Sequence, residues 1–263
     1  MRFVLFGDDY GIKQLCGFIP AEFLQAIVAA ENRPQYHHWI VKIADSRAVD
    51  FLIQPKKTSA NYISFINHVK NINPNFIFVN SYSMLLPPEI LEIPKCGAIN
   101  IHSALLPQYR GANPIQWALL NDEKETGATI HYMDAGFDTG DIIAQKKVPI
   151  LEEDTWLDIQ QRIGCATDQM LAEEIPKIVS GTNSRMRQRD DLARYWKRRR
   201  PEDGRFEWTW RARDIYNLIR ALVKPHAGAF YYDKNGHKVV IDSFLSLHEV
   251  KMLQMAQIGH VIG

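Results

Sequence analysis

Short apolar runs alternate with amphipathic stretches over the first 150 residues of the chain. Apolar runs bounded by Gly, Pro or polar residues are typical of buried strands. Such strands are expected at residues 2–6, 38–44, 76–79, 98–101, 128–133 and 142–150. Apolar side chains at helical spacing predict helices at residues 20–30, 59–71 and 114–120, and a short helix among the prolines at 87–94. The alternation predicts an α/β fold, with a mostly parallel sheet flanked by helices.

The sequence changes in character after a long amphipathic stretch. A helix is predicted to begin near Thr155, an N-cap residue, and to end at Gly181. Residues 183–205 are polar and basic. A further helix and two strands joined by an Asn-Gly turn are expected at 212–222, 229–232 and 238–244. We therefore expect a large domain at residues 1–199 and a small α+β C-terminal subdomain at 200–263.

Composition excludes several classes of protein. The formal net charge is +1, from 31 basic and 30 acidic residues. The chain therefore lacks the strong overall positive charge that would indicate a nucleic-acid partner. Three widely spaced cysteines form neither a disulfide framework nor a zinc pattern, which favours a cytoplasmic protein without a structural metal. No stretch approaches a membrane span or a signal peptide.

Two polar side chains stand at the end of the predicted strand 98–101. Asn100 and His102 are two residues apart, so they point to the same face of the strand. An amide that donates hydrogen bonds beside an imidazole that titrates near neutrality suits acyl transfer. A loop histidine that only caps backbone groups would give the same local pattern.

An acidic, glycine-rich loop follows the predicted strand 128–133. It could be a solvated turn, or it could bring a carboxylate to His102 and favour the charged imidazole. Because ligands of parallel sheets bind where strands end, we expect the site among the loops after residues 6, 79, 101 and 133.

The stretch Asn100-x-His-x-Ser-x-Leu-Pro107, followed by Tyr109-Arg-Gly111, resembles the signature of the folate-dependent formyltransferases. That family includes glycinamide ribonucleotide, methionyl-tRNA and sugar N-formyltransferases. Further matching segments follow in order, at residues 87–91, 114–120, 125–133 and 137–141. The resemblance covers about residues 1–180 and implies a Rossmann-like catalytic domain.

The resemblance also implies a site. Its catalytic residues would be Asn100, His102 and Asp138, with either His102 or Asp138 as the base, and 10-formyltetrahydrofolate as co-substrate. The implied mechanism is direct attack of an amine on the formyl group, without a metal or a covalent enzyme intermediate. The pterin would lie between two loops, contacting Ser83, Met84, Leu85, Leu86, Asp134, Ala135, Gly136 and Phe137.

The acceptor is predicted from weaker similarity. Residues 199–208 and 219–230 resemble segments of sugar N-formyltransferases, which act on nucleotide-linked dideoxy-amino hexoses or aminoarabinose. We therefore expect a cytoplasmic homodimer that serves the synthesis of surface polysaccharide, such as lipopolysaccharide O-antigen. Expected substrate contacts are Asp8, Asp9, Tyr10, Ser103, Tyr109, Arg110 and Gly111.

Three alternatives stay open at this point. An enzyme like methionyl-tRNA formyltransferase would use the basic run at 197–200 on RNA, although that run is also typical of a solvated linker. A hydrolase would use the same three residues on water and release formate from formyltetrahydrofolate. A protein that binds folate or nucleotide without catalysis would not need all three polar residues.

Overall fold

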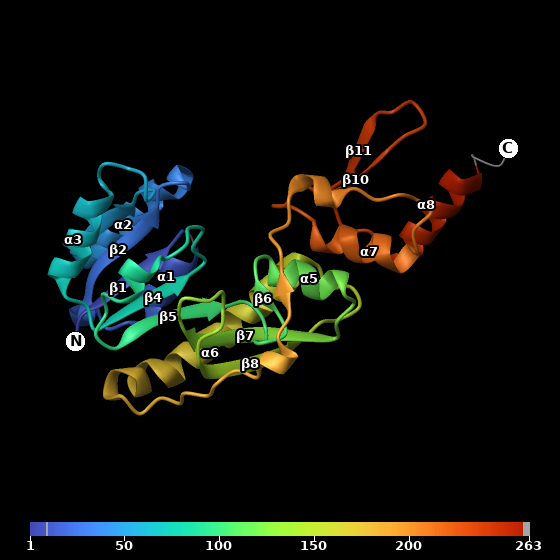
Figure 1. Cartoon of the computed structure of the whole chain (residues 1–263). Coiled ribbons are helices and arrows are strands. Elements are labelled where there is room, and N and C mark those ends of the chain that lie inside the picture. Colours follow the sequence, from blue (N-terminus) through green and yellow to red (C-terminus); the bar gives the residue numbers. More distant parts are fainter. Residues whose placement is uncertain (9, 260–263) are drawn as a thin grey trace. The chain divides into compact units, whose positions relative to one another are not determined.

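A seven-stranded sheet is the largest element of the structure, a computed structural model that describes residues 1–8 and 10–259 (Figure 1). Its strand order is β3-β2-β1-β4-β5-β7-β8. The strands are β1 (Phe3–Gly7), β2 (Leu24–Ala30), β3 (Asp50–Gln54), β4 (Phe76–Asn80), β5 (Gly97–His102), β7 (Glu125–Tyr132) and β8 (Ile142–Pro149). The chain forms two compact units: Met1–His102, Ala128–Lys146 and Thr167–Asp191 in one, Ser103–Gly127, Lys147–Ala166 and Leu192–Gly263 in the other.

Strand direction divides the sheet. The first five strands in spatial order, from β3 to β5, are parallel, whereas β7 pairs antiparallel with β5. The mostly parallel α/β sheet expected from the sequence is thereby confirmed. The loop after β7 leaves the opposite edge of the sheet from the loops after β1, β4 and β5, because that strand runs the opposite way.

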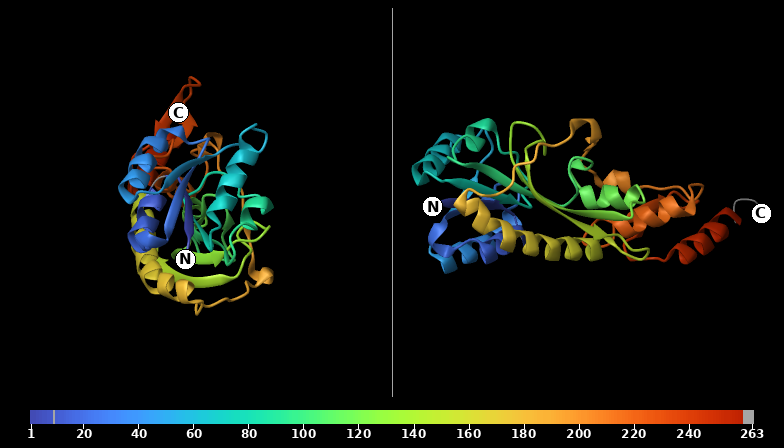
Figure 2. Two further views of the ribbon diagram at one scale, coloured as in Figure 1. Left: turned by 90° about the vertical axis from the view of Figure 1, so that its left-hand side faces the viewer. Right: turned by 90° about the horizontal axis from the view of Figure 1, so that it is seen from below.

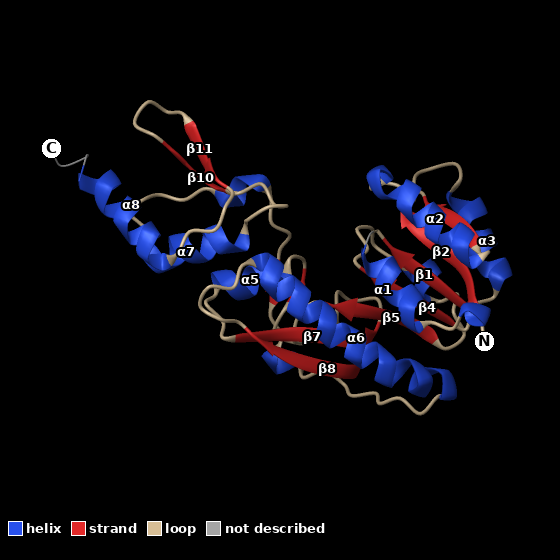
Figure 3. Ribbon diagram, turned by 180° about the vertical axis from the view of Figure 1, so that it is seen from behind, coloured by secondary structure: helices blue, strands red, loops and turns tan. Residues whose placement is uncertain are grey.

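Helices cover the sheet of the first unit on both faces (Figure 3). They are α1 (Tyr10–Phe18), α2 (His37–Arg47), α3 (Tyr62–Ile72) and α4 (Pro88–Leu91). Residues of α3 and α4 share a core cluster with alternate strand residues such as Val4 and Phe6. The other face meets α1, because Gly7 lies directly against Ile12.

Two elements differ from the sequence-based expectation. Residues 24–30 form the strand β2 where a helix was expected, and residues 38–44 lie in the helix α2 where a strand was expected. Strand β2 is buried at almost every position, so its alanine-rich sequence lacks the alternation of a half-exposed strand. Helix α2 buries only Ile40 and Ala44, four residues apart, and leaves Trp39 exposed.

The remaining predicted elements are confirmed within a few residues, including the helices at 59–71 and 114–120 and the strands from 76 to 150. Helix α1 and strand β3 were not expected. Four short 3-10 helices complete the connections, at Ala21–Phe23, Pro34–Tyr36, Asp190–Leu192 and Pro201–Gly204. Within the described residues, no helix is long and apolar enough to cross a membrane.

The second unit has its own small core. It contains β6 (Arg110–Gly111), α5 (Pro114–Leu120), β9 (Tyr195–Trp196), α7 (Ala212–Ala221), β10 (Ala229–Tyr232), β11 (Lys238–Ile241) and α8 (Leu247–Gly259). Strands β10 and β11 form the expected antiparallel pair, and α8 was not expected. The long helix α6 (Trp156–Ser180), yellow in Figure 2, contributes residues to both units. The boundary expected at residue 199 stays a prediction.

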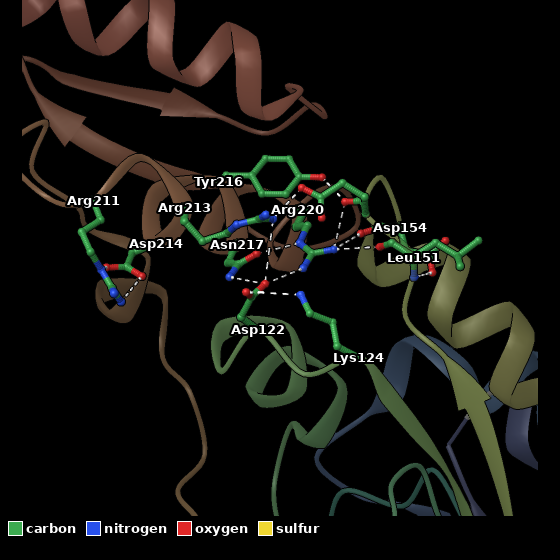
Figure 4. Close-up of polar contacts among 11 residues, drawn as sticks. Asp122, Lys124, Leu151, Asp154, Arg211, Arg213, Asp214, Tyr216, Asn217 and Arg220 are labelled. Atoms are coloured by element: carbon green, nitrogen blue, oxygen red, sulfur yellow. Dashed lines mark hydrogen bonds and ion pairs between the residues drawn. The ribbon is translucent and has the colours of Figure 1, made fainter.

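A buried arginine connects the parts of the second unit (Figure 4). The Arg220 guanidinium donates to the carbonyl oxygens of Leu151, Glu152 and Asp154, each at 3.2 Å, and to Asn217 Oδ1 at 2.9 Å. Its Nη2 lies 3.7 Å from Asp122 Oδ1. Helix α7 is thereby tied to the segments that follow α5 and β8.

Candidate active site

A hydrogen-bonded pair across β5 and β7 forms the centre of the site. Asn100 and His131 are opposite each other in the antiparallel ladder, and Asn100 Nδ2 lies 3.1 Å from His131 Nε2. Residues opposite each other in such a ladder have their side chains on the same face and in contact. The reversal of β7 therefore brings a second histidine onto the face that carries Asn100 and His102.

The protonation of His131 fixes the orientation of the Asn100 amide. His131 Nδ1 lies 2.7 Å from the carbonyl oxygen of Tyr132, which can only accept, so Nδ1 carries the proton. Burial lowers the pKa of His131 to about 4, and the side chain is 1% exposed, so the ring is neutral at pH 7. Its Nε2 is then an acceptor, and the amide nitrogen of Asn100 must face it. One N–H of Asn100 is used in this way, and the other points elsewhere.

Asp138 lies between the two histidines. Its Oδ2 is 3.8 Å from His102 Nδ1, and its Oδ1 is 3.7 Å from His131 Nε2. The structure thus brings Asn100, His102 and Asp138 together, as the sequence suggested, around a neutral imidazole.

The loop that carries Asp138 is held by side chains at both ends. Asp134 accepts from the Gly136 N–H at 2.9 Å and from the Thr139 hydroxyl. The buried Gln188 amide donates to the carbonyl oxygens of Asp138 at 2.8 Å and Gly140 at 2.7 Å. Asp138 has a positive φ of 56°, a left-handed conformation that is uncommon for non-glycine residues, although aspartate adopts it more readily than most.

The predicted pterin contacts lie in two loops of the first unit. In the loop after β4, Leu85 is 65% exposed, whereas Leu86 is buried in the core and can offer only its main chain. Ser83 and Met84 are half-buried, and the Ser83 hydroxyl donates to Asn32 Oδ1 at 2.7 Å. In the loop after β7, residues 134–137 are all exposed.

The predicted acceptor contacts of the first unit differ in exposure. Asp8 is buried, its N–H donates to the carbonyl oxygen of Ser81 at 3.2 Å, and burial raises the pKa of its carboxyl. Tyr10 is exposed at the start of α1. Asp9 lies outside the described residues.

The other predicted acceptor contacts belong to the second unit. Arg110 is 2% exposed, and its Nη1 donates to the Tyr195 hydroxyl at 2.8 Å. Tyr109 stacks on Trp196 with ring centroids 5.5 Å apart, and Gly111 has the positive φ of 101° that suits glycine. Ser103 is half-buried. Tyr109 and Arg110 thus already pack against the chain, and their roles toward a ligand stay predictions.

Sequence reasoning missed His131 and Gln188. His131 lies in the predicted strand 128–133, and a histidine in an otherwise apolar strand was the available signal. Gln188 gave no signal, because its partners are main-chain carbonyls 48 and 50 residues away. Among the described residues, no group of three or more His, Cys, Asp or Glu side chains could hold a metal ion.

This arrangement supplies the parts that acyl transfer needs. An oriented amide N–H can donate to an oxygen that gains negative charge, and an imidazole beside a carboxylate can accept and return a proton. All of these groups belong to the first unit.

Family comparison gives two matches. The family described as "Formyl transferase" matches residues 25–175, and "Formyl transferase, C-terminal domain" matches residues 198–263. Two curated relatives are similar in sequence. A bifunctional polymyxin resistance protein ArnA from Wigglesworthia glossinidia brevipalpis is 37% identical over 191 residues, or 73% of this chain. A methionyl-tRNA formyltransferase from Thermodesulfovibrio yellowstonii is 40% identical over 184 residues, or 70% of this chain.

The aligned parts span 29% and 59% of those two relatives. Solved structures show the same fold. A sugar N-formyltransferase from Shewanella sp. has a TM-score of 0.73 at 21% identity, over 94% of this chain and 97% of the other. The formyltransferase PseJ from Anoxybacillus kamchatkensis, in complex with UDP-4,6-dideoxy-4-formamido-L-AltNAc and tetrahydrofolate, has a TM-score of 0.51 at 28% identity, over 75% of this chain and 86% of the other.

Proposed function

The chain belongs to the formyl transferase family, and on that premise we propose that it transfers a formyl group from 10-formyltetrahydrofolate to the amine of a nucleotide-linked amino sugar. The observation that carries the proposal is the grouping of Asn100, His102 and Asp138 around the neutral His131. Each of the three side chains has a separate task in the reaction.

The uncharged amine attacks the formyl carbon directly, a new C–N bond forms, and the bond from that carbon to N10 of the folate breaks. One proton leaves the amine and one is taken up by N10, so no further reactant is needed. The second N–H of Asn100 stabilises the negative charge that develops on the formyl oxygen. The His102–Asp138 pair moves the proton as a unit.

We assign the reduced folate to the two loops of the first unit that follow β4 and β7. The loop after β4 combines exposed and half-buried residues at 83–85 with the buried Leu86, so its main chain is fixed close to the surface. Backbone N–H and C=O groups held in this way suit the hydrogen-bonding edge of a pterin. Residues 134–137 would contact it from the other loop.

A small nucleotide-linked acceptor is favoured by the near-neutral charge of the chain and by the sugar that PseJ binds. We propose a dideoxy-amino hexose or aminoarabinose destined for surface polysaccharide, such as lipopolysaccharide O-antigen. The proposal keeps the homodimer and the cytoplasmic location expected from the sequence.

A second candidate is formyl transfer to methionyl-tRNA. The methionyl-tRNA formyltransferase from Thermodesulfovibrio yellowstonii is 40% identical to this chain over 184 residues. In addition, an exposed basic run is formed by Lys197, Arg198 and Arg200. Lysine and arginine side chains bind the phosphates of nucleic acid, with an affinity that falls as salt rises.

Release of tetrahydrofolate decides between these functions. The enzyme is incubated with 10-formyltetrahydrofolate alone, with thymidine- or uridine-diphosphate amino sugars, or with methionyl-tRNA. The proposal predicts release only with an amino sugar. Release only with methionyl-tRNA would support the second candidate, and release without any amine would identify a hydrolase and refute both.

A further inference from the structure

The loop that follows β4 is held from a distance by a single buried amide. Gln54 is the last residue of β3 and is 2% exposed. The Tyr82 hydroxyl donates to Gln54 Oε1 at 2.8 Å, and Gln54 Nε2 donates to the carbonyl oxygen of Leu85 at 3.2 Å. One side chain thus joins the beginning of the loop to its end.

The Leu85 carbonyl determines which way this amide points. A carbonyl oxygen only accepts, so the Gln54 nitrogen must face Leu85 and its oxygen must face Tyr82. Burial raises the pKa of the Tyr82 phenol, so its hydroxyl keeps the proton that it donates to Gln54. A flipped amide would place its oxygen against the Leu85 carbonyl oxygen and lose that hydrogen bond.

Gln54 shares the support of this loop with the buried Asp8. The Asp8 N–H donates to the Ser81 carbonyl oxygen at 3.2 Å, and its carboxyl group accepts from Ser83. The Tyr82 ring packs edge-on against Phe6, with centroids 5.4 Å apart, so the phenol cannot move without disturbing the core. The Ser83–Asn32 hydrogen bond also holds the loop, but it is exposed to water and therefore weaker. The Gln54 bonds are partly buried and connect Tyr82 with Leu85, three positions later in the loop.

We propose that Gln54 is a positioning residue for the reduced folate: through Tyr82 and the Leu85 carbonyl it fixes the main chain that contacts the pterin. The inference rests on the proposed function, and it predicts a selective effect on folate binding. Gln54 does not contact the reacting atoms, so the chemical step and the acceptor site keep their properties.

The test compares Gln54→Met with the wild-type protein. Methionine keeps the length of the side chain and removes both hydrogen bonds. Binding of 5-formyltetrahydrofolate, a stable probe, is measured by calorimetry, and steady-state kinetics are measured at varied 10-formyltetrahydrofolate. We expect the Kd and the KM for folate to rise about tenfold, with kcat and the acceptor KM within about twofold.

Two further variants and a control sharpen the test. Tyr82→Phe removes one of the two bonds and should raise the folate KM about threefold. In Gln54→Glu, the protonated carboxyl can accept from Tyr82 and donate to Leu85, whereas the ionised form cannot donate, so the folate KM should rise with pH more steeply than in the wild type. The control is Gln25, which lies near the start of the neighbouring strand β2 and donates to the Phe23 and Leu24 carbonyls. Gln25→Met should leave folate binding unchanged.

Unchanged folate binding in a folded Gln54→Met protein would overturn the inference, as would equal losses for folate and acceptor. If Gln54→Met does not fold, Tyr82→Phe and the pH profile of Gln54→Glu decide in its place. A wild-type protein that does not bind 5-formyltetrahydrofolate would instead contradict the proposed function.

Discussion

At the scale of single residues, the site depends on where one proton lies. His131 donates from Nδ1 to the Tyr132 carbonyl and accepts at Nε2 from Asn100. That tautomer turns the Asn100 amide so that nitrogen, not oxygen, faces the histidine, and it fixes the direction of the remaining N–H. The donor that acyl transfer needs is therefore set by a residue that takes no part in the proposed transfer itself.

Single substitutions of the three proposed catalytic residues test their roles. Asn100→Ala removes an oxyanion donor, and His102→Ala or Asp138→Asn removes part of the proton-transfer pair. Each should lower kcat roughly 100- to 1000-fold. Steady-state formyl transfer measures the effect, and circular dichroism checks that the fold persists. Wild-type activity in any folded variant would refute the role assigned to that residue.

The depressed pKa of His131 makes a prediction about stability. Its pKa is 6.5 in a solvated chain and about 4 in the folded protein, so protonation favours the unfolded state. This contribution to stability is complete above pH 6.5 and is lost as pH falls toward 4. We expect about 3 kcal/mol of the free energy of unfolding to be lost over that range because of His131, measured by urea unfolding at several pH values.

His131→Gln provides the comparison, because glutamine keeps a polar side chain that does not titrate. The slope of unfolding free energy against pH should be shallower in this variant between pH 6.5 and 4. Equal slopes in the variant and the wild type would show that His131 is not the group responsible.

At the scale of elements, the reversed strand β7 assembles the site. Because β7 runs antiparallel to β5, His131 lies opposite Asn100, and the loop that follows β7 returns Asp138 toward His102. A parallel strand would have ended its loop at the other edge of the sheet. The direction of one strand thus decides which side chains meet.

The sequence predicted the sheet, most helices and the proximity of Asn100, His102 and Asp138. The first two follow from local hydrophobic patterns, and the third follows from motifs that resemble a known family. It could not predict β2 or α2. Their apolar residues fit both the helical and the strand period, and only the packing, which buries β2 on both faces and α2 on one, decides between the two. It also could not place His131, since cross-strand register depends on the direction of β7. Gln54 and Gln188 bond to distant main-chain carbonyls, which no side-chain pattern encodes.

The loop that carries Asp138 should depend on Gln188. Gln188→Leu removes both hydrogen bonds to the loop and leaves two carbonyls without these donors. Because Asp138 is held at a positive φ, a looser loop lets its carboxylate leave His102. We expect kcat to fall about tenfold. Gln161→Leu, on the exposed surface of α6, is the matched control and should be neutral; a neutral Gln188→Leu would contradict this account.

At the scale of the whole molecule, each unit has its own buried polar side chain with several partners, His131 in the first and Arg220 in the second. The proposed catalytic residues belong to the first unit, whereas Arg220 and its partners belong to the second. Burial lowers the pKa of Arg220, and its charge is compensated by three carbonyls, Asn217 and the nearby Asp122 (Figure 4). A buried cation satisfied in this way is costly to disturb.

Arg220→Met should therefore lower the free energy of unfolding by about 3 kcal/mol, because several buried acceptors lose their donor. Urea unfolding measures the change. Arg211→Met is the control: Arg211 is exposed and its guanidinium pairs with Asp214, three residues later, so its loss should cost less than about 1 kcal/mol. Equal effects of the two substitutions would contradict the role given to Arg220.

The most direct test of the central claim follows the formyl carbon itself. The protein is mixed with 10-formyltetrahydrofolate that carries a labelled formyl carbon and with a nucleotide-linked amino sugar, and the products are separated by mass spectrometry. The account predicts the label in an amide on the sugar with the wild-type protein, and almost none with Asp138→Asn. Label recovered as formate, or on the sugar to the same extent with Asp138→Asn, would contradict it.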